Sequence, residues 1–187
     1  MRILRAAEYR RMPWKNGKGE TVEIAVFPPG ASVESFDWRI STATVAEEGP
    51  FSHFADIDRT LSILTGDGMR LSVESREPVL LLQSSQPYAF PGDAATTAAL
   101  TGGPITDLNV MTRRDRFTHR VRRLLVSGSL EIAPRAETTV VIVTESASLS
   151  DQHLDAMDAV VLDAADAPAT VHAREDAAVF VIEIRPA

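Results

Sequence analysis

The chain has 187 residues, 44% of them hydrophobic, which allows one large domain or two small ones with a buried core. Its net charge of −7 at pH 7 argues against nucleic acid as the main partner, because binding phosphates requires a basic surface. The absence of cysteine excludes disulfides, thiolate zinc sites and a cysteine nucleophile. Residues 1–8 lack the apolar segment of a secretory signal, and no apolar run is long enough to span a membrane. We therefore expect a cytoplasmic protein that has no membrane contact.

Alternating apolar and polar residues predict many short strands, interrupted by glycine and proline about every ten positions. The expected strands, in chain order, are 21–27, 36–45, 60–64, 69–73, 79–82, 108–112, 122–133, 138–144, 158–162, 170–172 and 178–184. The sequence Thr65-Gly66-Asp67-Gly68 predicts a hairpin turn. Helical periodicity is limited to residues 6–11 and 145–152. The pattern is typical of an all-β sandwich or barrel with few, short helices.

The most highly charged stretch, residues 113–120, lies near the middle of the chain and carries four arginines. We interpret it as the junction between two similar β halves, residues 1–115 and 116–187. Such a basic run could contact phosphates, but in an acidic chain a solvated connector is the favoured interpretation. The ligand pocket is expected in the first half.

Histidine spacing bears on whether the chain holds a metal ion. The four histidines are His53, His119, His153 and His172, and no two of them lie within five residues of each other. A metal site needs three or four ligands that converge, so we predict neither a metal site nor any other cofactor. His53, between Ser52 and Phe54, is the best candidate of the four to line a pocket.

Polar side chains embedded in the predicted strands indicate a ligand site. Arg39 and Ser41 fall on one face of strand 36–45, Arg59 precedes an apolar strand, and Asn109 lies on the strand around 108–112. If both arginines face the interior of a barrel, their guanidinium groups would bind a carboxylate, and Ser41 and Asn109 would bind its polar substituents. The alternative for either arginine is a structural ion pair with one of three aspartates: Asp37, Asp58 or Asp107.

A glycine-containing loop precedes the strand at 21–27. Its sequence, Asn16-Gly17-Lys18-Gly19, lacks the spacing of a nucleotide-binding loop and leads into a strand rather than a helix. It can still bring backbone N–H groups close to a ligand. A plain turn is the alternative, although the preceding Trp14 and Lys15 favour a binding role.

Several uncommon short sequence motifs follow one another along the first 115 residues. They are Met12–Gly17, Thr21–Ile24, Phe36–Ser41, Gly49–Ser52, Ile57–Arg59, Phe90–Asp93 and Asp107–Arg114. Together they resemble the HutD/Ves family of histidine-utilisation proteins, over roughly residues 1–185 and less strongly in the second half. The family pattern usually has a third glycine where this chain has Lys18, which would place a long cation at the mouth of the expected pocket.

The resemblance implies a bicupin, with two cupin-type β-barrels in one chain and no metal-binding motif. It also implies a cytoplasmic bacterial regulator of histidine degradation that binds a small anionic metabolite: formiminoglutamate, formylglutamate or urocanate. The expected ligand-binding residues are Trp14, Lys15, Asn16, Arg39, Ser41, Ser52, Arg59, Asp107 and Asn109. No catalytic activity and no cofactor are implied, and a homodimer is left open.

Two other functions are ranked below the regulator. One is a metal-independent cupin enzyme that acts on a small organic acid, with Glu23 or His53 as the acid–base group. The other is a protein-interaction module that uses residues 113–123 against an acidic partner.

Overall fold

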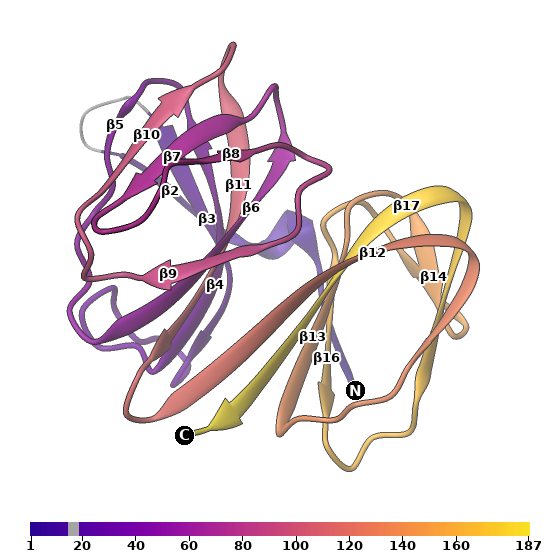
Figure 1. Ribbon diagram of the computed structural model, residues 1–187. Coiled ribbons are helices and arrows are strands. Elements are labelled where there is room, and N and C mark those ends of the chain that lie inside the picture. The colour runs from indigo at the N-terminus through magenta and orange to yellow at the C-terminus, as the bar shows by residue number, and fades with distance from the viewer. Residues whose placement is uncertain (15–18) are drawn as a thin grey trace. The chain divides into compact units, whose positions relative to one another are not determined.

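The computed structural model describes residues 1–14 and 19–187, with the backbone alone at residues 174 and 175. In this part of the chain the fold is all-β, and its one helix is a single 3-10 turn, η1 (Ala6–Glu8) (Figure 1). No helix among the described residues is long and apolar enough to cross a membrane. The expected fold class is therefore confirmed at the level of an all-β chain.

The chain divides into two compact units. One comprises Arg10–Thr118 with Ala187 and is called here the 10–118 unit. The other comprises Met1–Tyr9 with His119–Pro186 and is called the 119–186 unit. This division differs from the expected halves at the N-terminus, because β1 (Arg2–Leu4) pairs with β16 (Ala159–Asp163) of the 119–186 unit.

The 10–118 unit contains two antiparallel sheets. The strands of the six-stranded sheet, in spatial order, are β2 (Arg10–Pro13), β3 (Gly19–Phe27), β4 (Trp38–Val45), β11 (Ile105–Arg113), β6 (Ile57–Thr65) and β9 (Tyr88–Pro91). Those of the four-stranded sheet are β5 (Gly49–Pro50), β10 (Thr96–Leu100), β7 (Met69–Val73) and β8 (Val79–Leu81). Side chains from both sheets form one core: Val45, Leu61, Ile63, Met69, Leu71, Val73, Leu81, Phe90, Ala98 and Ile105.

The turn expected to close a hairpin has a different role. Gly66 and Gly68 both adopt positive φ, where a side chain is strained. A Cβ at Gly68 would lie 2.3 Å from the carbonyl oxygen of Leu81, so the site requires glycine. The strands on either side, β6 and β7, belong to different sheets, so the turn carries the chain from one sheet to the other and the hairpin prediction was wrong.

The 119–186 unit has one curled seven-stranded sheet. Its strands, in spatial order, are β1, β16, β13 (Thr138–Val143), β17 (Ala169–Pro186), β14 (Ala147–Leu149) and β15 (Gln152–Leu154), with β12 (Phe117–Ile132) pairing with β17. Its core is aliphatic: Val126, Ile132, Val141, Val143, Ala147, Leu149, Leu154, Val160, Leu162, Ala169, Val171, Ala173, Ala177, Val179 and Val181. Two strands are longer than expected, because β17 spans both 170–172 and 178–184, and β12 begins at Phe117 rather than at residue 122.

Both helix predictions fail, for different reasons. Within residues 145–152 the buried side chains Ala147 and Leu149 alternate with Ser148, which is the period of a strand, and the segment forms β14 and the start of β15. Within residues 6–11 only the 3-10 turn forms, and β2 begins at Arg10. The segment 113–120 is likewise no simple connector, because β12 starts at Phe117.

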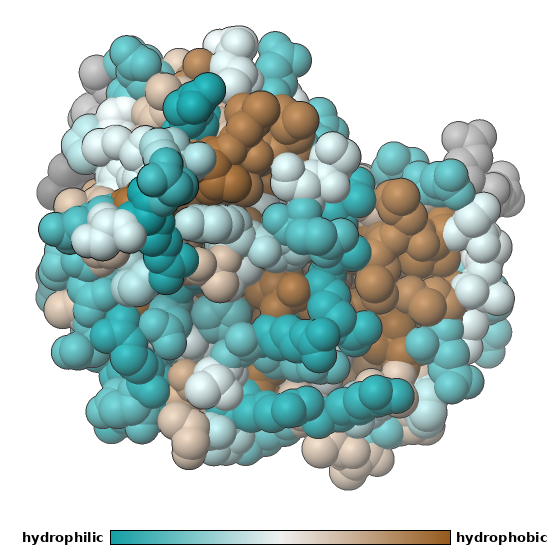
Figure 2. Space-filling model, in the orientation of Figure 1, coloured by the Kyte–Doolittle hydropathy of each residue, from teal (hydrophilic) through white to brown (hydrophobic). Residues whose placement is uncertain are grey.

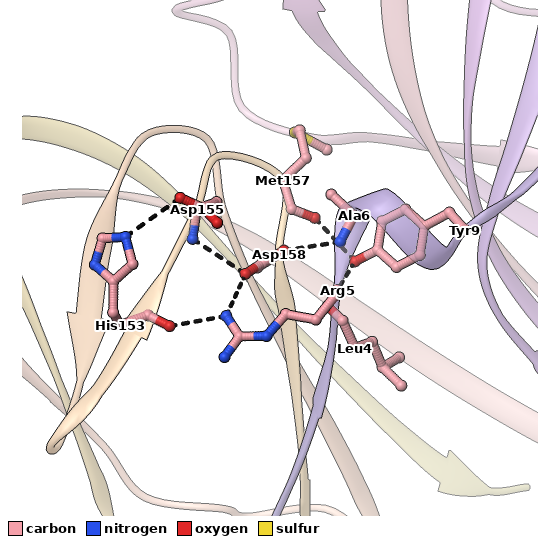
Figure 3. A network of polar contacts seen from close by, with 8 residues as sticks. All are labelled: Leu4, Arg5, Ala6, Tyr9, His153, Asp155, Met157 and Asp158. Atoms are coloured by element: carbon pink, nitrogen blue, oxygen red, sulfur yellow. Dashed lines mark hydrogen bonds and ion pairs between the residues drawn. The ribbon is translucent and has the colours of Figure 1, made fainter.

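The N-terminal segment is fixed to the 119–186 unit by a buried carboxylate (Figure 3). Arg5 Nη1 donates to Asp158 Oδ2, and the Ala6 N–H donates to Asp158 Oδ1, each over 2.7 Å. Burial opposes ionisation of Asp158, but the Ala6 N–H and the Arg5 guanidinium outweigh it, so the pKa of this carboxyl is lowered. The Tyr9 hydroxyl donates to the Met157 carbonyl over 2.9 Å, and burial raises the pKa of Tyr9.

The surface seen in Figure 2 is mainly hydrophilic, with apolar areas between the charged side chains. Large apolar side chains that are exposed among the described residues are Met1, Phe27, Val33, Leu80, Leu82 and Leu125. Scattered apolar side chains of this kind are normal for a folded protein.

Candidate functional site

A cavity of about 780 Å³ opens within the 10–118 unit. Seven of the nine residues predicted to bind the ligand line it: Trp14, Arg39, Ser41, Ser52, Arg59, Asp107 and Asn109. The other two, Lys15 and Asn16, lie outside the described residues, as does Lys18. Residues from separate strands and loops are thus gathered around one cavity, although their role in binding stays a prediction.

Strand register explains why three of these residues share a wall. Asp107 and Asn109 are two positions apart on β11, so their side chains emerge on the same face. On the neighbouring strand β4, Asn109 is paired with Ser41 and Asp107 with Ala43. This face of the six-stranded sheet also carries Leu61 of the core, opposite Asn109 on β6.

The two predicted arginines flank one residue of the central strand. Met111 of β11 is paired with Arg39 on β4 and with Arg59 on β6. Neighbouring strands lie about 4.8 Å apart, so the two arginine Cα atoms are separated by roughly 10 Å. Arg39 is 5% exposed and Arg59 is 7% exposed. The cavity therefore has two buried guanidinium groups on one wall.

The Arg59 guanidinium is held on several sides. Its Nε donates to Asn109 Oδ1 over 2.8 Å, and its Nη2 donates to the same oxygen. Its Cζ lies 4.5 Å from the centre of the Phe51 ring and 5.6 Å from that of Phe90, within the range of cation–π contacts. Burial lowers the pKa of Arg59 to about 10, so the group stays charged at neutral pH.

Arg39 is compensated by a different partner. Its Nε donates to Glu23 Oε2 over 2.8 Å, and both side chains are largely buried. Among the described residues, no hydrogen bond engages the two terminal nitrogens of Arg39. Within the described part of the chain, the Arg39 side chain thus has further donors available toward the cavity that it lines.

Asp107 is a nearly inaccessible carboxyl group in the cavity wall, with 1% exposure. It accepts a short hydrogen bond from Asn109 Nδ2. Burial raises the pKa of Asp107 to about 7, against the opposing effects of the Arg59 charge, the Ala43 backbone and the Asn109 amide. Near neutral pH this group therefore exists in both protonation states.

Of the three aspartates considered as structural partners of Arg39 and Arg59, two pair with other arginines. Asp37 accepts from Arg116 Nη1 at 2.8 Å, and Asp58 accepts from Arg114 Nε at 2.9 Å. Only Asp107 lies near the predicted site, where the Asn109 amide connects it to Arg59. The basic segment 113–120 thus contributes ion pairs within the 10–118 unit.

Gly19, the first residue of β3, occupies a position where a side chain would clash with its neighbours. A Cβ at Gly19 would lie 2.2 Å from the carbonyl oxygen of Thr44 and 2.9 Å from the Trp14 ring. Trp14 Nε1 donates to Thr21 Oγ1 over 2.8 Å, which fixes the indole at the cavity wall. The absence of a side chain at Gly19 thus allows close packing against β4 and Trp14.

Two residues considered for acid–base chemistry are placed unfavourably for it. His53 is exposed and is absent from the cavity wall, although its neighbours Ser52 and Phe54 both line it, so the expected pocket position was wrong. Glu23 is committed to Arg39 and does not line the cavity. Within residues 1–14 and 19–187, no three His, Asp or Glu side chains cluster in a way that could hold a metal ion.

Some lining residues were not anticipated. Phe51 contacts Arg59 although only its neighbour Ser52 was predicted, and Met111 separates the two arginines. The alternation of Asp107, Asn109 and Met111 on one strand could have indicated Met111. No sequence signal indicates Phe51, because a loop residue has no periodicity to follow.

Comparison with known proteins connects the chain to one family. The HutD family profile matches residues 6–181. An uncharacterised 21.2 kDa protein in the hutC 3′ region of Pseudomonas putida is 37% identical over 146 residues, which cover 78% of this chain and 75% of that protein. The solved structure of HutD from Pseudomonas fluorescens SBW25 is 32% identical, with a TM-score of 0.84 over 100% of this chain and 98% of that one.

A more distant structural likeness concerns the fold alone. The bacterial pirin YhhW from Escherichia coli superposes with a TM-score of 0.71 at 10% identity, over 99% of this chain and 98% of that one. The all-β chain with its curled sheets is thus cupin-like.

Proposed function

Because the chain belongs to the HutD family, we propose that it binds a small carboxylate intermediate of histidine degradation and regulates that pathway. The ligand would occupy the cavity of the 10–118 unit, and the candidates are formiminoglutamate, formylglutamate and urocanate. The observation that carries the proposal is the pair of buried arginines on one cavity wall, with the terminal nitrogens of Arg39 unused among the described residues.

The chemistry of the cavity fits such a ligand. A guanidinium group binds a carboxylate through two parallel hydrogen bonds, and burial strengthens that contact because water competes less. The cavity is also lined by apolar side chains suited to a flat or aliphatic ligand body: Met12, Pro13, Trp14, Val33, Phe51 and Phe54.

Calorimetric titration with the three candidates tests the proposal. We expect heat of binding with at least one of them, a weaker affinity in Arg39→Ala and Arg59→Ala, and an unchanged affinity in Arg114→Ala. Arg114 is the matched control because it is an ion-paired arginine of the same unit that does not line the cavity. Absence of heat with all three compounds, in a folded protein, would contradict the proposed function.

We also propose that each unit is a cupin-type barrel, which makes the chain a bicupin. The two-sheet arrangement of the 10–118 unit, the curled sheet of the 119–186 unit and the likeness to pirin support this. A crystal structure in which either unit remained an open sheet would argue against it.

A further inference from the structure

Asp107 is an unexpected group in a cavity suited to anions. It lines the cavity, is 1% exposed, and projects from the same face of β11 as Asn109. The Asn109 amide connects it to the cationic wall, because Oδ1 accepts from Arg59 while Nδ2 donates to Asp107. A carboxylate ligand bound to Arg59 would therefore come close to a second, buried carboxyl group.

Among the described residues, the charges around Asp107 come from β3, β4, β6 and the segment after β4. β4 contributes Arg39, with Glu23 of β3 behind it, and β6 contributes Arg59. The segment after β4 contributes two glutamates at the cavity rim: Glu47 and Glu48. The lining residues from β2, β10 and the segment 51–54 carry no charge: Met12, Pro13, Ala98, Phe51, Ser52 and Phe54.

Among the described residues, this arrangement leaves limited positive charge for two anions. Arg39 is paired with Glu23, so Arg59 is the main cation in this part of the wall that can compensate Asp107. A ligand carboxylate on the same guanidinium would compete with Asp107 for that charge and repel it across a medium of low dielectric constant. Two carboxylates at such a site are most stable when they share one proton.

We propose that a carboxylate ligand binds in this cavity together with one proton, which Asp107 takes up. The inference rests on the proposed function and adds a specificity-determining residue to it. The pKa of Asp107 is about 7, so protonating it near neutral pH requires little free energy. A bound anion would raise this pKa further. Affinity would then fall as the pH rises above 7, by up to about tenfold per pH unit.

Calorimetry of the wild-type chain in two buffers of different ionisation enthalpy, Pipes and Tris, counts the protons taken up. Formylglutamate is the first probe, because its carboxyl groups stay ionised between pH 6 and 9, about two units or more above their usual pKa. We expect between about 0.5 and 0.8 proton per ligand at pH 7.5, and close to none at pH 5.5, where Asp107 is already protonated. If formylglutamate gives no heat, urocanate replaces it, and Asp107→Asn then measures the protons that urocanate itself contributes.

Two variants locate the proton. Asp107→Asn keeps the size of the side chain but cannot titrate, so we expect no proton uptake and an affinity that does not change between pH 6 and 9. Glu48→Gln, which removes an acid at the rim of the same cavity, should keep the wild-type proton count. If Asp107→Asn does not fold, the difference in proton count between pH 5.5 and pH 7.5 in the wild-type chain remains the test.

The outcomes separate this inference from the function on which it rests. Heat of binding without proton uptake in the wild-type chain overturns the inference and leaves ligand binding intact. Loss of proton uptake in Glu48→Gln, with its retention in Asp107→Asn, overturns it as well. Absence of heat with every candidate in the wild-type chain overturns the proposed function.

Discussion

The inward faces of the two units differ in residue type although both are built from antiparallel strands. In the 10–118 unit, β4 directs Arg39, Ser41 and Ala43 toward the cavity. In the 119–186 unit, β16 places Val160 and Leu162 in a core made only of aliphatic side chains. Strand alternation decides which residues face inward, and their chemistry decides whether the interior is filled or open. The predictions below test this contrast.

The largest effect on stability is expected from a substitution in the packed core of the 119–186 unit. Leu162 is fully buried in the core of the 119–186 unit, so Leu162→Ala should lower the free energy of unfolding by about 2–5 kcal/mol. Urea denaturation followed by circular dichroism measures this loss. Ligand affinity of the folded variant should be unchanged, and a large change in affinity would contradict the separation of roles between the units.

Substitutions in the cavity wall of the 10–118 unit should change ligand affinity more than folding stability. Arg59→Ala or Arg39→Ala should weaken carboxylate binding by about 2–4 kcal/mol, because each removes a buried charged donor. Calorimetry of both variants measures the change. An unchanged affinity in both would move the binding site to another part of the molecule.

A buried acid in the cavity wall should also make stability depend on pH. The pKa of Asp107 is about 7 in the folded chain, whereas an unfolded aspartate titrates near 3.9, so the folded state binds this proton more tightly. Its contribution to stability is present below about pH 4 and is lost as the pH rises toward about 7. Between these values, Asp107→Asn should gain stability relative to the wild type, on the order of 2 kcal/mol.

Denaturant titrations of the wild-type chain and of Asp107→Asn at several pH values measure this difference. A gap between the two that stays constant from pH 4 to pH 7 would show that the Asp107 carboxyl titrates normally. Asp93→Asn provides the control. The hydrogen bonds that Asp93 accepts from Arg114 lower the pKa of this carboxyl, so its contribution to stability changes with pH in the opposite direction to that of Asp107.

The smallest effect is expected at the surface of the 10–118 unit. Arg114 bridges Asp58 and Asp93, but all three side chains are substantially exposed. Exposed ion pairs contribute little, so Arg114→Ala should cost less than about 1 kcal/mol, and the cost should shrink in high salt. Thermal unfolding at low and high ionic strength measures it, and a loss that is insensitive to salt would indicate a packing role for Arg114 instead.

The all-β class and much of the site could be predicted because both depend on local alternation. Arg39 and Ser41 share a strand face, as do Asp107 and Asn109, and this spacing is visible in the sequence. The Glu23 partner of Arg39 was not predictable, since it depends on the pairing of β3 with β4. The contact of Phe51 with Arg59 depends likewise on long-range packing of a loop.

The strands of the 119–186 unit were harder to predict than those of the 10–118 unit. In the 10–118 unit, Ile40 and Leu61 lie within the predicted strands 36–45 and 60–64, and both are fully buried. In the 119–186 unit, Ser127 and Gly128 lie inside β12, which runs from Phe117 to Ile132 without a break. Strand pairing here outweighs the local preference of a single glycine. The place of β1 could not be foreseen, because its partner lies more than 150 residues away in the sequence.

The pairing of Ile3 with Val160 has a consequence for synthesis of the protein on the ribosome. The first strand to emerge has to wait for a partner that is translated roughly 150 residues later, which at about 5–20 residues per second takes on the order of 10 s. During that interval the β1 backbone has no strand partner, and the Arg5–Asp158 contact cannot form. The 10–118 unit, whose segments are contiguous, can complete its folding first. Co-translational folding should therefore begin within residues 10–118, and the 119–186 unit with residues 1–9 should form afterwards.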